Sequence, residues 1–247
     1  MNGKPFRLQS VGRSFGTLEV FRDLTLEIEP GEFVAIVGPS GCGKTTLLNL
    51  MAGFDRPTVG KLESAGRKRM VFQQDGLFPW LTVCENIALG LRDIKDKSER
   101  QRQTEELLRL IRLEDFGQHY PHQLSGGMRQ RVELARALAG SSDILLMDEP
   151  FSALDYLTRL TMRQELARLL AKRPRTVVLV THDIEEAAQL ADRVLVLSER
   201  PARIQRELRI PISRPRNPTQ PAVVAAIHTI LTELDIERDA GEYSVAL

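Results

Sequence analysis

An α/β fold built around a parallel β-sheet is the fold class that this sequence predicts, and three observations support it. In the second half of the chain, apolar runs typical of buried strands alternate with helix-forming stretches. Earlier, a glycine-rich turn at residues 38–45 joins one such run to a helix. Between these two regions lies a long helical block, which predicts a second lobe beside the sheet.

The first elements follow from short apolar runs. Segment 6–28 carries such runs, broken by glycine and aspartate, which predicts short antiparallel strands. Residues 32–37 predict a buried strand and residues 45–52 a helix. Residues 53–69 are polar and turn-rich, and a short buried strand is expected at 70–72.

Helical periodicity begins near residue 82. Residues 83–91 and 98–111 predict helices, and a third helix opens near Ser125. We expect this block to form the second lobe.

The remaining chain returns to alternation. Apolar strands are expected at 144–147, 176–180 and 194–197, separated by helices near 155–172 and 183–190. These are βα units of a parallel sheet.

The composition is that of an ordinary globular protein, with 42% hydrophobic and 27% charged residues among 247. The 34 lysines and arginines balance 33 aspartates and glutamates, so no basic excess favours nucleic acid as a partner. The two cysteines, Cys42 and Cys84, make no disulfide framework and fit a reducing compartment. Because we find no secretory signal and no apolar stretch of membrane-spanning length, we expect a cytoplasmic protein.

The phosphate loop is the segment Gly38-Pro39-Ser40-Gly41-Cys42-Gly43-Lys44-Thr45, of the form G-x-x-x-x-G-K-[ST] between a strand and a helix. In such a turn the backbone N–H groups point at a phosphate chain, Lys44 reaches the β and γ oxygens, and the Thr45 hydroxyl takes Mg²⁺. Its glycines let the backbone approach the anion without a Cβ in the way. We expect this loop and Thr46 to bind the phosphate chain of a nucleotide. A glycine-rich turn with a surface lysine is the alternative, which the flanking strand and helix disfavour.

Polar side chains follow three of the expected strands. Asp148 is suited to hold Mg²⁺ through water, and Glu149 to polarise the attacking water. His182 ends the next strand and can hydrogen-bond a γ-phosphate, while Gln73 could reach both Mg²⁺ and the water. We take Lys44, Gln73, Glu149 and His182 as the catalytic candidates. An acidic turn that closes a strand, or ordinary polar strand ends, remain the alternatives for these positions.

A second anion site is expected at the Ser125 turn, Leu124-Ser125-Gly126-Gly127-Met128. Ser125 is placed as a helix N-cap, and the two glycines keep the backbone amides accessible. One γ-phosphate cannot need two full cradles from one chain. The arrangement makes sense if two protomers meet face to face, each placing its Ser125 turn over the partner's nucleotide.

The motifs match, in order, those of ABC-type ATPases, and the chain resembles this family from Phe6 to about Leu208; the matching segments are residues 38–45, Gln73, 124–128, 144–149, 152–155 and His182. The resemblance implies a P-loop NTPase fold with a RecA-like core, an antiparallel β subdomain and a helical subdomain. It also implies that Phe15 stacks on adenine and that Asp155 lies in a loop communicating between the two dimer sites. A core position is the alternative for Phe15.

The domain limits follow from this resemblance and from the prolines beyond Ile210, which mark an extended connector before a last short helix ending near Leu234. We expect the ABC ATPase domain at 1–210, with its helical subdomain at about 74–138. A C-terminal extension with a short helix is expected at 211–247.

A narrower resemblance comes from residues 71–83, which are similar to the nitrate/sulfonate/taurine branch of bacterial importer ATPases. The triplet 41–43 and the segment 197–204 are similar to the same branch. Between Gly60 and Met70 the chain departs from the family, because the usual turn and strand pair is shortened here.

In this family Leu77, Phe78, Pro79 and Trp80 border the groove that receives a cytoplasmic helix of a membrane subunit. A loop carrying phenylalanine and tryptophan after Gln73 also predicts an exposed apolar patch that wants a partner. Packing of Trp80 within the helical lobe is the alternative.

The expected function is therefore an ATP-hydrolysing motor that acts as a homodimer beneath integral membrane permease subunits, on the inner face of the membrane. An extracytoplasmic binding protein delivers a small oxyanion of the nitrate, sulfonate or taurine class. The runner-up is an ABC ATPase without a permease, in DNA repair or translation, but this chain has neither a long coiled coil nor tandem cassettes. A P-loop kinase is a third hypothesis, and it leaves the Ser125 turn without a role.

Overall fold

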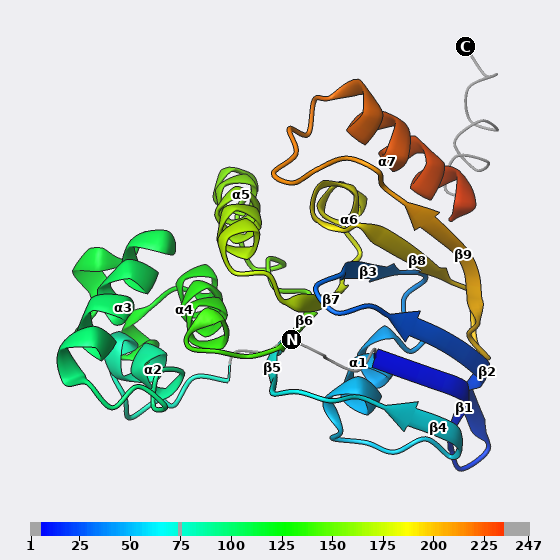
Figure 1. Cartoon of the computed structure of the whole chain (residues 1–247), viewed down its shortest axis with the longest axis horizontal. Coiled ribbons are helices and arrows are strands. Elements are labelled where there is room, and N and C mark those ends of the chain that lie inside the picture. The colour runs from blue at the N-terminus through cyan, green and yellow to red at the C-terminus, as the bar shows by residue number, and fades with distance from the viewer. Residues whose placement is uncertain (1–5, 74–75, 235–247) are drawn as a thin grey trace.

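A computed structural model describes residues 6–73 and 76–234 (Figure 1). Two β-sheets form the centre of the molecule, a six-stranded sheet in the order β5-β6-β7-β3-β8-β9 and a three-stranded sheet in the order β2-β1-β4. Within the described residues, the helices are all too short or too polar to cross a membrane.

The six-stranded sheet is parallel except at one edge. Its four central strands are buried along their whole length; they are β3 (Phe33–Val37), β6 (Ile144–Asp148), β7 (Thr176–Val180) and β8 (Arg193–Leu197). The edges are β5 (Lys68–Val71) and β9 (Ile204–Arg209), and β9 alone among these six runs antiparallel to its neighbour. Strands buried on both faces read as continuous apolar runs, which is why the sequence predicts the central ones well.

Alternate residues of the central strands supply two hydrophobic cores, one on each face of the sheet. Val34 and Ile36 of β3 pack with α1 (Lys44–Ala52) and with the three-stranded sheet. Phe33 and Ala35 face the other core, which joins α5 (Tyr156–Lys172) and α6 (Ile184–Leu190). The period of two along a strand divides the side chains between the two cores.

The helical lobe consists of α2 (Val83–Leu89), α3 (Lys97–Leu110) and α4 (Gly126–Leu138), with short 3₁₀ turns η1 (Glu114–Phe116) and η2 (Pro121–Gln123) between α3 and α4. These helices gather on one side of the six-stranded sheet in Figure 1. The predicted second lobe is thus present, although residues 74–75 at its expected start lie outside the described residues.

The three-stranded sheet corrects one expectation. Instead of short strands, residues 6–28 form two long ones, β1 (Phe6–Phe15) and β2 (Leu18–Ile28). Gly16 adopts a positive φ in the connecting turn, and Asp23 has a φ of 55° within β2. Asp23 therefore bends a strand rather than ending one.

Two further strands were missed by the sequence analysis. Segment 53–69, expected as turns, contains β4 (Val59–Glu63), and β9 begins only at the last residue of the segment 197–204 that the resemblance marked. Both carry mostly exposed residues, so neither has the apolar run that indicates a strand. β5 also starts at Lys68 rather than Met70.

The chain beyond Ile210 packs onto the main domain through α7 (Pro221–Glu233), which lies against α6 (Figure 1). Val223 and Ile230 of this helix are buried in the same core as β3. Arg216, also buried, donates to the carbonyls of Ala188 and Ala191 at the end of α6. The expected division at residue 210 stays a prediction, and residues 1–5 and 235–247 of the expected domains lie outside the described residues.

Candidate functional site

The candidate site lies at the carboxyl edge of the six-stranded sheet, where open α/β sheets place their ligands. The phosphate loop follows β3, and Gln73 follows β5 after one residue. Asp148 ends β6 with Glu149 directly after it, and His182 follows β7 after one residue. Parallel pairing of these strands carries the polar residues to one edge.

The phosphate loop is fitted tightly between neighbouring strands. A Cβ on Gly43, whose φ is 116°, would lie 2.5 Å from Cγ1 of Val20 and 2.8 Å from Cζ of Phe21. A Cβ on Gly38 would lie 2.8 Å from the carbonyl oxygen of Leu197. Glycine is required at these positions because the loop backbone touches β2 and the end of β8.

Lys44 begins α1, and its ammonium group is held by the loop itself. Nζ donates to the carbonyls of Gly38, at 2.8 Å, and Pro39, at 2.9 Å. The first N–H groups of an α-helix have no partner within the helix, so the N-terminus of α1 is an anion-binding end. The loop therefore combines backbone donors with one lysine, as recognition of phosphate requires.

The other loop residues have simpler environments. Pro39, Ser40 and Gly41 are exposed, and Thr46 is half-buried in the first turn of α1. Cys42 is buried, and this burial raises the pKa of its thiol. A thiol of raised pKa is a poor nucleophile, which supports the view of Cys42 as a small side chain tolerated in a tight loop.

Asp148 is buried at the end of β6, with only 2% of its surface exposed. Burial raises the pKa of its carboxyl, while a hydrogen bond from the Thr45 side chain acts in the opposite direction. A carboxylate and a hydroxyl that meet in this way form a set of hard oxygen ligands.

Glu149 has a strained backbone conformation. Its φ of 47° lies in the left-handed region, which costs a non-glycine residue on the order of 1 kcal/mol. The strained backbone is held from both sides, because its N–H donates to the carbonyl of Val180 at 2.9 Å and its carbonyl accepts from the side chain of Gln130 at 3.0 Å. Strain held this firmly is typical of functional positions.

The Glu149 carboxylate meets two of the other catalytic candidates. Nδ1 of His182 lies 3.2 Å from Oε1, and Nε2 of Gln73 donates to Oε2 at 3.4 Å. The His182 side chain is 64% exposed, whereas that of Glu149 is 18% exposed. The structure thus brings Gln73, after β5, and His182, after β7, into contact with the Glu149 carboxylate, after β6.

The Ser125 turn stands apart from the phosphate loop. Ser125 caps α4 by accepting from the backbone N–H of Met128 at 3.2 Å, and both Ser125 and Gly126 are exposed. Gly127 is half-buried. A Cβ at this position would lie 3.0 Å from the carbonyl oxygen of Ala153, so there is little room for a larger residue. α4 packs on α2, α3 and β5, while α1 packs on β5, β6 and β7, so the two predicted anion sites belong to different lobes.

One face of α4 carries polar residues that the sequence analysis missed. Gln130 also accepts from the N–H of Ala153 at 3.0 Å, which ties α4 to the loop after Glu149. Buried Glu133 accepts from the backbone N–H groups of Phe72 and Gly76, on either side of the Gln73 segment. Polar residues spaced three apart on a helix face that packs against the sheet were the available signal.

Exposure decides the alternatives left open for the aromatic residues. Phe15 is 48% exposed, and the guanidinium of Arg13 lies 4.1 Å from its ring centroid, so it is not a core residue. Trp80 is 69% exposed, which excludes packing within the helical lobe. Leu77, expected at a groove border, is instead buried, while Phe78 and Pro79 are exposed.

Asp155 caps α5, and a hydrogen bond with Thr158 lowers the pKa of its carboxyl.

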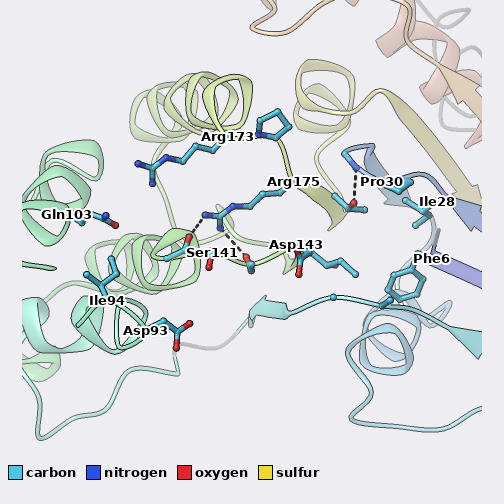
Figure 2. A pocket seen from close by; sticks show the side chains of 18 residues that line it. Phe6, Ile28, Pro30, Asp93, Ile94, Gln103, Ser141, Asp143, Arg173 and Arg175 are labelled. Atoms are coloured by element: carbon cyan, nitrogen blue, oxygen red, sulfur yellow. Dashed lines mark hydrogen bonds between the residues drawn. The ribbon is translucent and has the colours of Figure 1, made fainter. Parts of the chain in front are cut away.

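The opposite edge of the sheet holds a large cavity of about 880 Å³, seen from close by in Figure 2. Its buried arginine has a structural role. Arg175 is buried there and donates to Oγ of Ser142 and to the carbonyls of Leu138 and Gly140. The phosphate loop and the converging side chains lie at the other edge, so size alone does not mark the functional site.

A comparison with known families decides the identity of this architecture. A family model described as ABC transporter matches residues 21–152 of the chain. The chain belongs to the ABC transporter family. The matched segment includes the phosphate loop, the Ser125 turn and Glu149.

Individual relatives of this ABC protein agree. An aliphatic sulfonates import ATP-binding protein of Rhodococcus jostii is 49% identical over 216 residues, which cover 85% of each chain. A taurine import ATP-binding protein of Jannaschia sp. is 42% identical and covers 80% of this chain and 77% of its own. The solved dimeric structure of a post-hydrolysis state of an ATP-binding cassette bound to ADP and Pi has a TM-score of 0.75 at 35% identity, covering 83% of this chain and 98% of that chain.

These findings confirm the predicted fold class, the P-loop NTPase fold of an ABC ATPase. They also confirm the predicted activity class, an ATPase with ATP as its nucleotide. The relatives named for sulfonate and taurine import agree with the branch that residues 71–83 suggested.

Proposed function

We propose that the chain is the ATP-hydrolysing motor subunit of a bacterial importer for a small oxyanion of the nitrate, sulfonate or taurine class, acting as a homodimer beneath a membrane permease. The observation that carries this proposal is the convergence of Gln73 and His182 on the Glu149 carboxylate. This group lies at the same sheet edge as the phosphate loop, in a chain whose relatives are named as import ATP-binding proteins.

In this proposal the phosphate loop and Thr46 bind the phosphates of ATP, and Phe15 stacks on the adenine. Lys44 exchanges the loop carbonyls that hold its ammonium group for the β- and γ-phosphate oxygens. Half of the Phe15 surface is open to a base, and Arg13 at its ring adds a cation to that surface.

The residues near Asp148 fit a magnesium ion. Thr45, Asp148 and Gln73 offer hydroxyl, carboxylate and amide oxygens, and Mg²⁺ is usually held by one or two carboxylates together with substrate phosphates. No cluster of three histidine, cysteine or acidic ligands occurs within the described part of the chain, which agrees with a site completed by the nucleotide. When bound, Mg²⁺ neutralises charge on the β- and γ-phosphates.

Hydrolysis then depends mainly on positioning and charge. Glu149 orients and polarises the attacking water, and its strained backbone fixes where the carboxylate points. His182 would donate to the γ-phosphate, and the Gln73 side chain would help to hold both the metal ion and the water. Lys44 supports the negative charge that spreads over the γ oxygens in the transition state.

The Ser125 turn acts on the partner protomer's nucleotide. Ser125 and Gly126 are exposed at the N-terminus of α4, and this turn lies in a different lobe from the phosphate loop of its own chain. A helix N-terminus with exposed amides stabilises an anion, so each Ser125 turn closes the site of the facing protomer. ATP binding then stabilises the dimer and hydrolysis releases it.

The permease groove is the surface between β5, the residues after it, and the ends of α2 and α4; it encloses about 750 Å³ and is lined by Phe72, Gly76, Phe78, Leu89 and the charged residues named below. The rings of exposed Phe78 and Trp80 contact each other in a tilted arrangement beside it, with a centroid distance of 5.4 Å. Aromatic side chains of this kind are the usual anchors of an interface. Glu133 and Arg136 bind the backbone at Gly76, so movement of Gln73 reaches the same surface.

The groove is strongly basic. Among the described residues that line it, the cations are Arg67, Lys68, Arg69, Arg92 and Arg136, and the one acid is Asp93. Asp93 already pairs with Arg67 at 2.9 Å. Lys68 and Arg92 have no carboxylate partner among the described residues. We therefore expect the permease helix that docks here to present acidic residues.

The remaining partners follow from this assignment. An extracytoplasmic binding protein delivers the solute to the permease, and the motor is cytoplasmic and peripheral on the inner face of the membrane. Nucleic acid is not expected as a partner, since the chain has a net charge of only +1.

The test is to isolate the tagged chain from its native membranes in mild detergent and to identify by mass spectrometry what accompanies it. A multi-span protein at about one-to-one stoichiometry is expected. Lys68→Glu with Arg92→Glu should remove that protein, whereas Arg102→Glu on the exposed face of α3 should not. A soluble partner or nucleic acid in place of the permease would contradict the proposal.

A further inference from the structure

Two segments that carry residues of the candidate site lie next to one another. They are the 149–155 loop after β6 and the 181–183 turn after β7. The first carries Glu149 and ends at Asp155, the cap of α5, and the second carries His182. They share the walls of a small cavity of about 10 Å³. Arg159, in the first turns of α5, lines this cavity together with both segments.

Arg159 makes one bond to each segment. Its Nη1 donates to Oδ2 of Asp183 at 2.9 Å, and its Nη2 donates to the carbonyl of Leu154 at 3.1 Å. The Arg159 side chain is 26% exposed, so most of it is shielded from water. One planar group thus spans the residue after His182 and the residue before Asp155.

The 181–183 turn is held by hydrogen bonds on its own side. The hydroxyl of Thr181 accepts from the N–H of Asp183 at 2.9 Å and donates to the buried carboxylate of Glu186 at 2.7 Å. Thr181 also ties the turn to β3, because its N–H donates to the carbonyl of Ile36. A shift of Asp183 therefore moves His182 as well.

The 149–155 loop is also held by hydrogen bonds. Ser152 donates from Oγ to the carbonyl of Glu149 at 3.0 Å, and the side chain of Gln130 bonds Ser152 and Ala153 from α4. These bonds tie the loop to α4, and the bond from Arg159 to Leu154 ties it to α5.

We propose that Arg159 is a positioning residue that couples the 149–155 loop to the turn carrying His182, so that engagement of the loop by the partner protomer sets the place of His182 over the γ-phosphate. The inference rests on the proposed function, because it needs two protomers and a γ-phosphate at His182. It assigns no contact between Arg159 and the nucleotide.

Arginine is suited to this task and lysine is not. Its planar fork holds two acceptors at once, whereas an ammonium group is a compact point charge. Arg163, one turn further along α5, differs in role: it is 1% exposed and contacts Asp183 and Glu186, both on the His182 side. Arg163 anchors the turn, and Arg159 joins it to the neighbouring loop.

The experiment is a double-mutant cycle on the full chain, with single-turnover ATP hydrolysis as the readout. We expect Arg159→Met to slow hydrolysis on the order of ten-fold, as displaced catalytic groups do, and to leave the KM for ATP within about two-fold. If Arg159 acts through His182, adding Arg159→Met to His182→Ala should cost less than about two-fold further, since residues that act as a unit are not additive.

Multiplicative losses in the double variant would overturn the inference, because they indicate an independent structural effect. So would an Arg159→Met variant that hydrolyses ATP at the wild-type rate. Arg168→Met removes an exposed arginine of the same helix and should match wild type. If Arg159→Met does not fold, Arg159→Lys decides: an intermediate rate supports the two-acceptor geometry, and the full wild-type rate contradicts it.

Failure of the proposed function gives a different result. A wild-type chain that does not hydrolyse ATP overturns the motor assignment itself. A wild-type chain that does so, with an Arg159→Met variant equal to it, overturns the coupling alone.

Discussion

The two edges of the six-stranded sheet use charged residues in opposite ways. At the amino edge, Arg193 donates to both oxygens of Glu32, to Glu207 and to the carbonyl of Glu27, and Arg175 is bonded to three oxygens. At the carboxyl edge, Glu149 sits on a strained backbone and His182 is largely exposed.

This difference separates stability from function within one sheet. Charges with a full set of partners hold the fold, whereas groups whose protein contacts are long, strained or exposed remain able to bind a ligand. The cavity of about 880 Å³ lies at the amino edge, where Arg175 has its hydrogen-bond partners. The hydrogen bonding and exposure of the side chains are therefore a better guide to the functional site than cavity volume.

The largest effect is expected at the carboxyl edge, from Lys44→Ala. Loss of a charged hydrogen bond to phosphate costs about 1.5–3 kcal/mol per bond, so we expect ATP to bind on the order of a hundred-fold more weakly. Equilibrium binding of a fluorescent ATP analogue measures this. Lys172→Ala, at the end of α5, is the control, and unchanged affinity in Lys44→Ala would contradict the assigned contact.

Ser125→Asp tests the turn in the other lobe. Aspartate caps a helix as well as serine does, so α4 keeps its N-terminus. Its carboxylate, however, repels a partner's γ-phosphate, and like charges across an interface cost several kcal/mol, so hydrolysis should fall on the order of a hundred-fold. Binding to the monomer should be unchanged. A kinase that works as a single chain would be nearly indifferent to this substitution.

Arg175→Met addresses the amino edge. It leaves the carbonyls of Leu138 and Gly140 without their donor, so we expect unfolding to become easier by about 3 kcal/mol. Urea denaturation measures this, with exposed Arg173→Met as the neighbouring control. The hydrolysis rate per folded molecule should not change. A variant that unfolds as wild type does but hydrolyses ATP more slowly would show that Arg175 has a role in function rather than in stability.

A smaller effect is expected from Glu186, which lies behind His182. Burial raises the pKa of this carboxyl from 4.5 to about 7, so the folded state binds its proton more tightly than the unfolded state. Its contribution to stability is complete below pH 4.5 and is lost as the pH rises through about 7.

Glu186→Gln should remove this pH dependence. Between pH 5 and pH 8, the free energy of unfolding of wild type should therefore fall by about 2 kcal/mol more than that of the variant. The amide oxygen can still accept from Thr181. Urea denaturation at both pH values checks it, and parallel shifts of the two proteins would show that Glu186 does not titrate in this range.

The sequence was most informative where the residues of one short segment are enough to determine its local structure. β3, β6, β7 and β8 are continuous apolar runs, and the phosphate loop needs its glycines wherever it occurs. β4 and β9 are exposed edge strands whose pairing depends on distant partners, so no local pattern marks them.

The same distinction holds within the site. Lys44, Glu149 and His182 stand at recognisable positions, at a loop or a strand end. Arg159 acts through a backbone atom of another segment, the carbonyl of Leu154, and a carbonyl leaves no signature in a sequence. Such positioning residues become visible only when the segments are placed in space.

The most direct test of the account is the state of a Glu149→Gln variant with saturating ATP and Mg²⁺. The isosteric amide removes the charge that orients water and keeps the fold, so ATP should remain bound and each Ser125 turn should stay closed over the partner's nucleotide. Size-exclusion chromatography is then expected to show a stable dimer that reverts to monomer when ATP is removed. A Glu149→Gln chain that binds ATP and elutes as a monomer would contradict the account.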